Sequence, residues 1–452
     1  MNKNTFSFHN YEEFKSKINE FEIDIPLTDD ISILKSEIKI ENTAIPNRLC
    51  IQPMEGCDSE LDGSPGPLTF RKYERFAKGG SGIIWVEATA VEMGGKAGPR
   101  QLHINKKSAP NFKKLAEIIK KKSQNYKGKK QNPFLVLQLT HSGRYSKPKG
   151  KPMPIIFHHS PYLDTLHKID SNYPLITDSE LDELQGKYIV AAKLAQKCGY
   201  DAIDVKSCHG YLLHEILTAH TRQGSKYGGS FENRTRFLTE LIKKIKKEVP
   251  GIIITTRVNI YDAIPFPYGW GVSKKRSCEP DLKEPLALIQ ILKKLGIKII
   301  NIAIGNPYYN PHIERPYDSS PTEKIYNEKH PLEIIAQNIK LTTEIAHKNP
   351  ELAVINTSMT WLREFLPNVA AGMIKKGICH FVGLGRMAIA YPDFANDILS
   401  DRKLDAKKIC ITCSSCSQIM RDGGKVGCVI RDAKIYGPIF KKCRKASPVD
   451  GV

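Results

Sequence analysis

The chain has 452 residues, 40% of them hydrophobic, which is enough to bury a core larger than that of a typical single domain. Its formal net charge of +20 lies largely in lysines of amphipathic helical windows, with no zinc-finger or RNP motif, so we expect no nucleic-acid site; an acidic protein partner remains an alternative. No apolar run approaches the roughly 20 residues that span a bilayer, and the amino terminus is unlike a signal peptide, so we expect a cytoplasmic protein without a membrane partner.

Short β-branched runs alternate with amphipathic helical windows through the middle of the chain, which is typical of parallel strands covered by helices. Eight strands are predicted, over residues 48–54, 82–88, 133–139, 201–206, 252–258, 297–303, 352–356 and 380–385. Seven helices are predicted, over Thr69–Lys78, Asn111–Lys122, Asp178–Cys198, Asn233–Val249, Leu282–Leu295, Pro331–His347 and Trp361–Lys376. No Gly-x-Gly-x-x-Gly turn opens the first unit, so an α/β fold of the TIM (β/α)8 barrel type is favoured over an open doubly wound sheet.

Two segments lie outside this alternation. Residues 1–40 read as an N-terminal extension, a helix followed by loosely structured acidic sequence, and residues 41–400 as the barrel. Residues 401–452 form a C-terminal segment with a cysteine cluster and a glycine-rich turn. The sequence does not determine the oligomeric state, and a homo-oligomer is one of the alternatives.

Polar or glycine-rich residues follow every predicted strand, at the end of the barrel where TIM-barrel enzymes carry their chemistry. The first strand is followed by QPMEG, the third by QLTHSGRY, the sixth by IGNPYYNPH and the eighth by GLGRMA. The fourth is the most crowded with groups that hold or transfer protons, because Lys206, His209 and Tyr211 come directly behind it. We therefore expect an active site at this end.

Four ordered blocks of sequence carry a resemblance to a known family. The stretch HGYLLHEILTAHTRQGSKYGGSFENRTRFLTEL closely resembles the signature of the Old Yellow Enzyme family, the FMN-dependent NADH:flavin oxidoreductases and ene-reductases. The stretches NRLCIQPM, LVLQLTHSGR and VGLGRMAIAYPDF resemble three further blocks in the same order, so the match covers roughly residues 40–400. The resemblance implies an FMN-binding TIM barrel supplied with electrons by NAD(P)H or by an electron-transfer protein.

Matching motif positions implies a flavin site. Pro53 and Met54 would lie against the isoalloxazine ring with Ala88 beside it, and Gln138 would bind the pyrimidine edge. Arg257 would place a fixed cation where negative charge collects on the reduced ring, and Gly385 with Arg386 would hold the phosphate. The chain departs from the family at residues 356–358, where Asn-Thr-Ser replaces a usual glycine, so side-chain donors are expected there.

The resemblance also implies catalytic roles. The family places two histidines, or a histidine and an asparagine, on a substrate oxygen; in this chain the pair falls on Lys206 and His209, with Tyr211 as the proton donor. Because an ammonium attracts an oxyanion more strongly than a neutral imidazole does, we expect a preference for an acid or thioester carbonyl. The implied reaction reduces an activated C=C bond of a small-molecule substrate; the alternatives are amine or alcohol oxidation, or a metal-binding electron-transfer protein on a barrel scaffold.

Four cysteines, Cys410, Cys413, Cys416 and Cys428, fall within 19 residues and indicate a metal site. Disulfides are disfavoured in a cytoplasmic chain. The spacing suits either a tetrahedral zinc ion or a 4Fe-4S cluster. Resemblance to the iron-sulfur branch of the family, which includes trimethylamine dehydrogenase and 2,4-dienoyl-CoA reductase types, favours the cluster.

Overall fold

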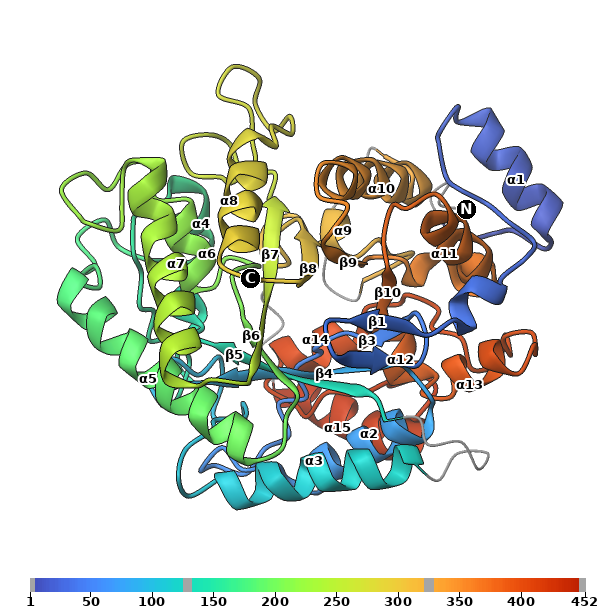
Figure 1. The fold of residues 1–452 in the computed structure, drawn as a ribbon, viewed down its shortest axis with the longest axis horizontal. Coiled ribbons are helices and arrows are strands. Elements are labelled where there is room, and N and C mark those ends of the chain that lie inside the picture. The colour runs from blue at the N-terminus through green and yellow to red at the C-terminus, as the bar shows by residue number, and fades with distance from the viewer. Residues whose placement is uncertain (1–4, 125–131, 321–328, 447–452) are drawn as a thin grey trace.

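The protein folds around a closed barrel of eight parallel strands, as the sequence predicts (Figure 1). The structure is a computed structural model that describes residues 5–124, 132–320 and 329–446, so the ends of the two terminal segments, residues 1–4 and 447–452, lie outside it. Each predicted strand corresponds to one barrel strand. In spatial order these are β10 (Phe381–Leu384), β3 (Leu49–Ile51), β4 (Ile83–Ala90), β5 (Phe134–Thr140), β6 (Ala202–Val205), β7 (Ile253–Tyr261), β8 (Ile299–Ile304) and β9 (Ala353–Asn356).

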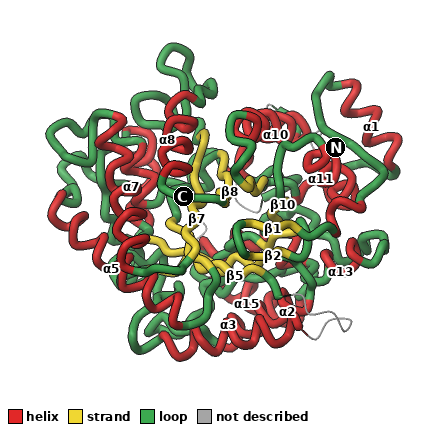
Figure 2. The backbone as a smooth tube through the Cα atoms, viewed as in Figure 1, coloured by secondary structure: helices red, strands yellow, loops and turns green. Residues whose placement is uncertain are grey.

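The strands were recognisable because both of their faces are covered. All residues of β4 and β5 are buried, and parallel strands buried on both faces give continuous hydrophobic runs. Figure 2 shows the strands gathered in the middle of the molecule with the helices around them. The carboxyl ends of all eight strands therefore meet at one mouth.

A short hairpin that the sequence analysis did not predict packs against the opposite end of the barrel. Its strands, β1 (Ile38–Ile40) and β2 (Thr43–Ile45), pair antiparallel. Ile45 joins a core cluster made of residues near the strand starts, including Trp85 and Phe381, and the two isoleucines of β1 pack on the same cluster. The hairpin thus covers the amino-terminal end of the barrel.

The long predicted helices surround the barrel, with ends that shift by a few residues. They are α2 (Pro67–Lys78), α3 (Ala109–Gln124), α5 (Asp178–Lys197), α7 (Phe231–Glu248), α8 (Lys283–Lys294), α10 (Pro331–His347) and α11 (Leu366–Lys375). Shorter elements lie between them: η1 (Ser32–Lys35), η2 (Gly143–Tyr145), α4 (Pro161–His167), α6 (Leu212–Leu217), α9 (Pro311–Glu314), η3 (Thr360–Phe365), α12 (Arg386–Ala390) and α13 (Phe394–Leu399). The predicted helix Trp361–Lys376 is therefore two elements, and the first of them, η3, contains Arg363, whose backbone is non-helical with φ 48°.

The N-terminal segment is docked on the barrel's outer layer. Its helix α1 (Tyr11–Glu20) buries Phe14, whose ring stacks on Phe365 with a centroid separation of 4.7 Å. Figure 1 shows α1 beside α11. No helix in the described part of the chain combines the length and apolar character needed to cross a membrane.

The C-terminal cysteine segment is anchored next to the mouth. It contains α14 (Ser415–Arg421) and α15 (Ala433–Ala446), and Figure 1 shows α15 next to α2. Asp432 accepts hydrogen bonds of 2.7 Å from both Arg71 and Arg75 of α2. The Val426 amide donates to the Gly56 carbonyl at 2.7 Å, which ties the segment to the loop after β3.

Candidate active site

A buried carboxylate, Asp204 on β6, organises the floor of the mouth. It accepts hydrogen bonds from Trp85 Nε1 at 2.9 Å and Gln138 Nε2 at 2.6 Å, and a 2.6 Å bond from the Arg257 backbone amide. Burial raises the pKa of Asp204, and these hydrogen bonds oppose the shift by favouring the ionised form. Asp204 therefore fixes which way the Gln138 amide faces, with its Nε2 toward the carboxylate.

The structure brings the residues of the predicted flavin site to this mouth from several strand ends. Pro53 is buried after β3, and a Cβ placed on Gly385 would lie 2.6 Å from Met54 Sδ, so the tips of β3 and β10 meet. Ala88 is buried in β4, and its carbonyl accepts a bond from Gln101. Arg386, the first residue of α12, is buried and donates through Nη2 to the Pro316 carbonyl at 2.8 Å.

Three polar atoms of this set have no hydrogen-bond partner in the described chain: Gln138 Oε1, Arg257 Nε and Arg386 Nη1. Leaving a buried polar group unpaired costs about 1–3 kcal/mol, so such atoms together indicate a polar ligand. An amide oxygen can accept from the N–H of a flavin pyrimidine ring, and two guanidinium groups can bind its carbonyl edge and its phosphate. The residues present therefore fit FMN.

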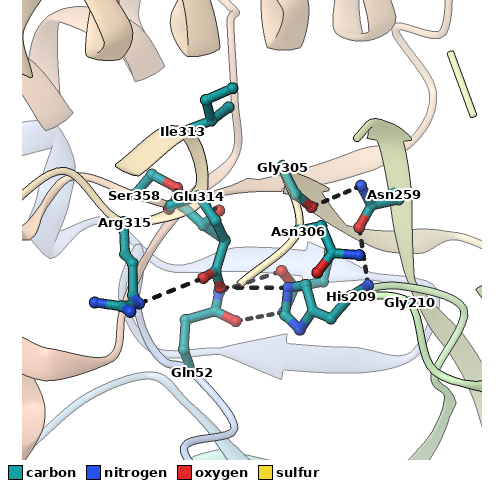
Figure 3. Close-up of polar contacts among 12 residues, drawn as sticks. Gln52, His209, Gly210, Asn259, Gly305, Asn306, Ile313, Glu314, Arg315 and Ser358 are labelled. Carbon is teal, nitrogen blue, oxygen red and sulfur yellow. Dashed lines mark hydrogen bonds and ion pairs between the residues drawn. The ribbon is translucent and has the colours of Figure 1, made fainter. Parts of the chain in front are cut away.

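The three predicted catalytic residues also come together. Lys206 Nζ lies 3.5 Å from the centroid of the Tyr211 ring, and His209 follows on the same loop. His209 has a left-handed backbone with φ 64°, and its amide donates to Asn259 Oδ1 on β7 at 3.1 Å. This bond holds an otherwise unfavourable conformation and aims the imidazole into the mouth (Figure 3).

Burial sets the protonation of these groups. It lowers the pKa of His209 well below its usual value, and the nearby Arg257 cation lowers it further, so the imidazole is neutral at physiological pH. Burial raises the pKa of the Tyr211 phenol well above 10, and the Glu55 carboxylate adds to the shift. The mouth thus holds a neutral imidazole and a protonated phenol within one loop, which is a pair able to bind a carbonyl oxygen and to donate a proton.

Comparison with known proteins decides the family. Residues 36–405 match the family described as NADH:flavin oxidoreductase / NADH oxidase. The chain belongs to this family. Membership identifies FMN as the flavin and oxidoreduction as the class of chemistry, in agreement with the sequence-based resemblance.

Two curated relatives illustrate the range of the family. An NADH oxidase of Thermoanaerobacter brockii is 26% identical over 431 residues, covering 93% of this chain and 56% of the relative. An NADPH dehydrogenase of Clostridium acetobutylicum is 30% identical over 273 residues, covering 59% of this chain and 72% of the relative. The chain therefore spans little more than half the length of the first.

Solved structures confirm the barrel fold. A 2-naphthoyl-CoA reductase in complex with 2-naphthoyl-CoA superposes with a TM-score of 0.70 at 21% identity, covering 93% of this chain and 59% of the other. An Old Yellow Enzyme homologue from Zymomonas mobilis gives a TM-score of 0.61 at 17% identity, covering 83% of this chain and 94% of the other. At these identities the likeness shows the fold alone.

The segment after β8 covers the mouth of this flavin oxidoreductase. Glu314, the last residue of α9, points to His209 with Oε1 3.4 Å from Nε2, as Figure 3 shows. The Ser358 hydroxyl donates a hydrogen bond to the backbone carbonyl of Glu314 in α9. Ser358, which we expected to offer its hydroxyl to the phosphate, is therefore already hydrogen-bonded. The Pro316 carbonyl of the same segment accepts a hydrogen bond from Arg386. The segment after β8 therefore contacts both the predicted substrate residue His209 and the predicted phosphate residue Arg386.

This position of Glu314 predicts an effect on cofactor affinity. Glu314→Gln should tighten FMN binding by about 3- to 10-fold. The segment that carries Glu314 contacts His209 and Arg386 at the predicted flavin site, so weakening the contact to His209 raises the fraction of molecules in which this segment does not compete with FMN. Fluorescence quenching during titration of apoprotein with FMN measures this dissociation constant. Glu351→Gln, an exposed change at the Lys293 ion pair, is the control; equal constants for wild type and Glu314→Gln would show that the carboxylate does not compete.

The four clustered cysteines line one pocket together with Arg386. Cys410 and Cys413 lie in a loop that leads into α14, which carries Cys416, and left-handed residues lie between successive cysteines, Thr412 with φ 52° and Ser414 with φ 55°. Burial raises the pKa of the Cys410 thiol to about 12, and the cation of Arg386 opposes the shift. The Cys410 sulfur accepts a hydrogen bond from the Thr412 backbone amide, with 3.4 Å between nitrogen and sulfur. Within the described residues, no three His, Cys, Asp or Glu side chains converge on one metal ion, so the predicted metal site stays a prediction.

Several residues at the mouth escaped the sequence analysis. Glu55 follows Pro53 and Met54 directly, and Tyr308 lies in the polar stretch after β8, so both could have been picked out by position at a strand end. Glu314 lies nine residues beyond Gly305 at the end of β8, and no local pattern marks it. Asp204 lies within β6, the strand that Lys206, His209 and Tyr211 follow.

Proposed function

We propose that this enzyme reduces the activated C=C bond of an α,β-unsaturated carbonyl compound, with NAD(P)H or an acidic electron-transfer protein as the source of electrons. FMN, when bound, supplies the hydride. The observation that carries the proposal is the neutral His209 imidazole beside the protonated Tyr211 phenol, both buried at the mouth next to the unpaired atoms of Gln138 and Arg257.

In this proposal each side chain has one task. His209 donates to the carbonyl oxygen and polarises the conjugated double bond, and Tyr211 gives its proton to the carbon next to the carbonyl. Arg257 places positive charge near the ring. Lys206 is paired with the Glu55 carboxylate at 3.6 Å, which balances its charge. A ketone or thioester carbonyl is therefore favoured over a free acid, which narrows the expectation drawn from the sequence.

Product analysis tests the reaction. Purified holoenzyme with NADPH or NADH and benzylideneacetone should yield the saturated ketone, at a rate matched by consumption of the nicotinamide. Cinnamate, which has the same skeleton but a free carboxylate, should react more slowly. Flavin that is reduced by the nicotinamide but not reoxidised by any activated alkene would overturn the proposal, and flavin reduction by an amine or alcohol would favour the alternative reaction.

We further propose that the four clustered cysteines hold a 4Fe-4S cluster. They line one pocket with Arg386, and the Arg431 amide donates to Cys428 Sγ at 3.2 Å, as amides do to cluster sulfurs. A single zinc ion with Zn–S bonds of about 2.3 Å draws its thiolates into direct proximity, whereas each iron of a cluster takes one thiolate. The resemblance of this cysteine group to that of the iron-sulfur branch of the family favours the cluster.

A cysteine variant tests this second proposal. Protein purified without oxygen should contain about four iron atoms per chain and show broad visible absorption beneath the flavin bands. Cys413→Ala should lower the iron content at least severalfold with FMN retained, while Cys443→Ala, which changes a cysteine outside the spacing motif, should leave it unchanged. Stoichiometric zinc in place of iron, or equal iron in both variants, would contradict the cluster.

A further inference from the structure

Glu55 stands where two of the predicted catalytic side chains meet. Its Oε1 accepts the Tyr211 hydroxyl at 2.8 Å and lies 3.6 Å from Lys206 Nζ, so one oxygen contacts both groups. The Glu55 side chain is only 11% exposed. Its backbone is fixed as well, because the following residue, Gly56, donates its amide to Glu87 and accepts the Val426 amide. Glu55 is thereby held in contact with both Lys206 and Tyr211.

The surroundings of Tyr211 leave few other routes for a proton. Besides Glu55, its hydroxyl has a neighbour in the Tyr308 hydroxyl at 3.4 Å. Tyr308 is itself fixed by stacking on Tyr145 with ring centroids 3.7 Å apart. Lys206 presents its ammonium to the face of the Tyr211 ring and to Glu55, and both contacts direct its charge toward the phenol.

We propose that Glu55 is a proton relay, which passes a proton from Lys206 to Tyr211 after Tyr211 has protonated the substrate. The inference rests on the alkene reduction proposed above and adds Glu55 to the residues that carry it. Lys206, which the family resemblance implied as a second donor to the carbonyl oxygen, becomes the source of the returning proton. His209 then binds the carbonyl oxygen alone.

The proton transfers balance in two steps. In the first, the O–H bond of Tyr211 breaks and a C–H bond forms at the carbon next to the carbonyl, with the electron pair of the O–H bond left on the phenolate. In the second, the ammonium of Lys206 gives a proton to the Glu55 carboxylate, which gives it to the phenolate oxygen. Tyr211 and Glu55 are restored, and Lys206 is left as a neutral amine that takes a proton from water as product leaves.

The electrostatics support each step. A phenolate beside the Glu55 carboxylate would be costly in a buried site, and the Lys206 cation over the ring offsets that cost while the phenolate exists. Burial lowers the pKa of the Lys206 ammonium, with Glu55 opposing the shift, so the lysine releases its proton more readily than an exposed lysine does.

Separate half-reactions test the relay. Glu55→Gln should slow the reoxidation of reduced flavin by benzylideneacetone by roughly 10- to 100-fold, with reduction of the flavin by NAD(P)H and the KM for the alkene each changed less than about threefold. Glu55→Asp, which keeps the carboxylate, should recover part of the rate. Glu60→Gln changes an exposed carboxylate of the same loop and serves as the matched control.

A titration that needs no turnover provides a second readout. In apoprotein followed by ultraviolet difference absorption, Glu55→Gln should lower the pKa of Tyr211, because removing a neighbouring negative charge makes the phenolate easier to form. The Glu55→Gln, Tyr211→Phe double variant should lack this transition. If wild type reduces no activated alkene, the proposed function fails while this titration still reports the coupling. Unchanged reoxidation together with an unchanged titration would overturn the relay.

Discussion

Replacing Tyr211 with phenylalanine is expected to slow alkene reduction by about 10²- to 10⁴-fold, because a positioned general acid contributes a factor of this size. Flavin reduction by NAD(P)H involves no proton from the phenol, so that half-reaction should stay within about twofold. The substitution removes one oxygen and keeps the ring over which Lys206 lies. Stopped-flow measurement of the two half-reactions gives both rates.

The control for this prediction is a buried tyrosine away from the mouth. Tyr188 on α5 is fully buried, and its hydroxyl has no partner among the described residues. Tyr188→Phe therefore removes the same atom from another buried position and should leave both half-reactions unchanged. If Tyr211→Phe slowed the two half-reactions equally, the hydroxyl would act on flavin or structure instead of on the substrate carbon.

The barrel could be predicted from the sequence because its strands are buried on both faces and so leave short hydrophobic runs that alternate with amphipathic helices. The β1–β2 hairpin leaves no such signal. Its strands have three residues each, and the burial of Ile45 depends on a core assembled from strands spread along the chain from β3 to β10. Short elements whose stability comes from tertiary packing carry too few residues to show a period.

The break in the predicted helix Trp361–Lys376 has a similar origin. Arg363 takes its left-handed backbone while its guanidinium donates to Asp318 and to the Ile411 carbonyl. Both partners lie more than 40 residues away in the chain. A residue with good helix propensity is thus drawn out of the helix by contacts that the local sequence does not contain.

The candidate site was likewise predictable only where its residues are close together in the sequence. Lys206, His209 and Tyr211 share one strand end, so sequence alone placed them together. What each of them contacts could not be read from that stretch, because Glu55 is 156 residues from Tyr211 and Glu314 comes from another strand end. The charge of Lys206 is balanced by a carboxylate from the loop after β3, which is why we propose a ketone or thioester carbonyl where the sequence led us to expect an acid or thioester.

Asp204→Asn is expected to lower the free energy of unfolding by about 2–4 kcal/mol, because at least one of the buried N–H groups that donate to this carboxylate loses its acceptor. The new amide keeps the volume of the carboxylate but turns one acceptor into a donor that faces Trp85 Nε1, Gln138 Nε2 or the Arg257 amide. Urea unfolding of the apoprotein measures this loss.

The same change should weaken FMN binding, since Asp204 holds the Gln138 amide with its Oε1 available, and a Gln138 free to flip would offer its nitrogen instead. Asp201→Asn is the contrasting variant: that carboxylate is one-third exposed, pairs with Lys120 and accepts the Leu135 amide at 2.8 Å. The oxygen of the new amide can still accept from Leu135 and water replaces the contact with Lys120, so the cost should stay below about 1 kcal/mol. Equal losses of stability in the two variants, or an unchanged FMN dissociation constant in Asp204→Asn, would show that the floor of the mouth does not depend on this carboxylate. The position of Asp204, between the barrel core and the residues that face the ligand, is what couples the stability of the fold to the orientation of the site.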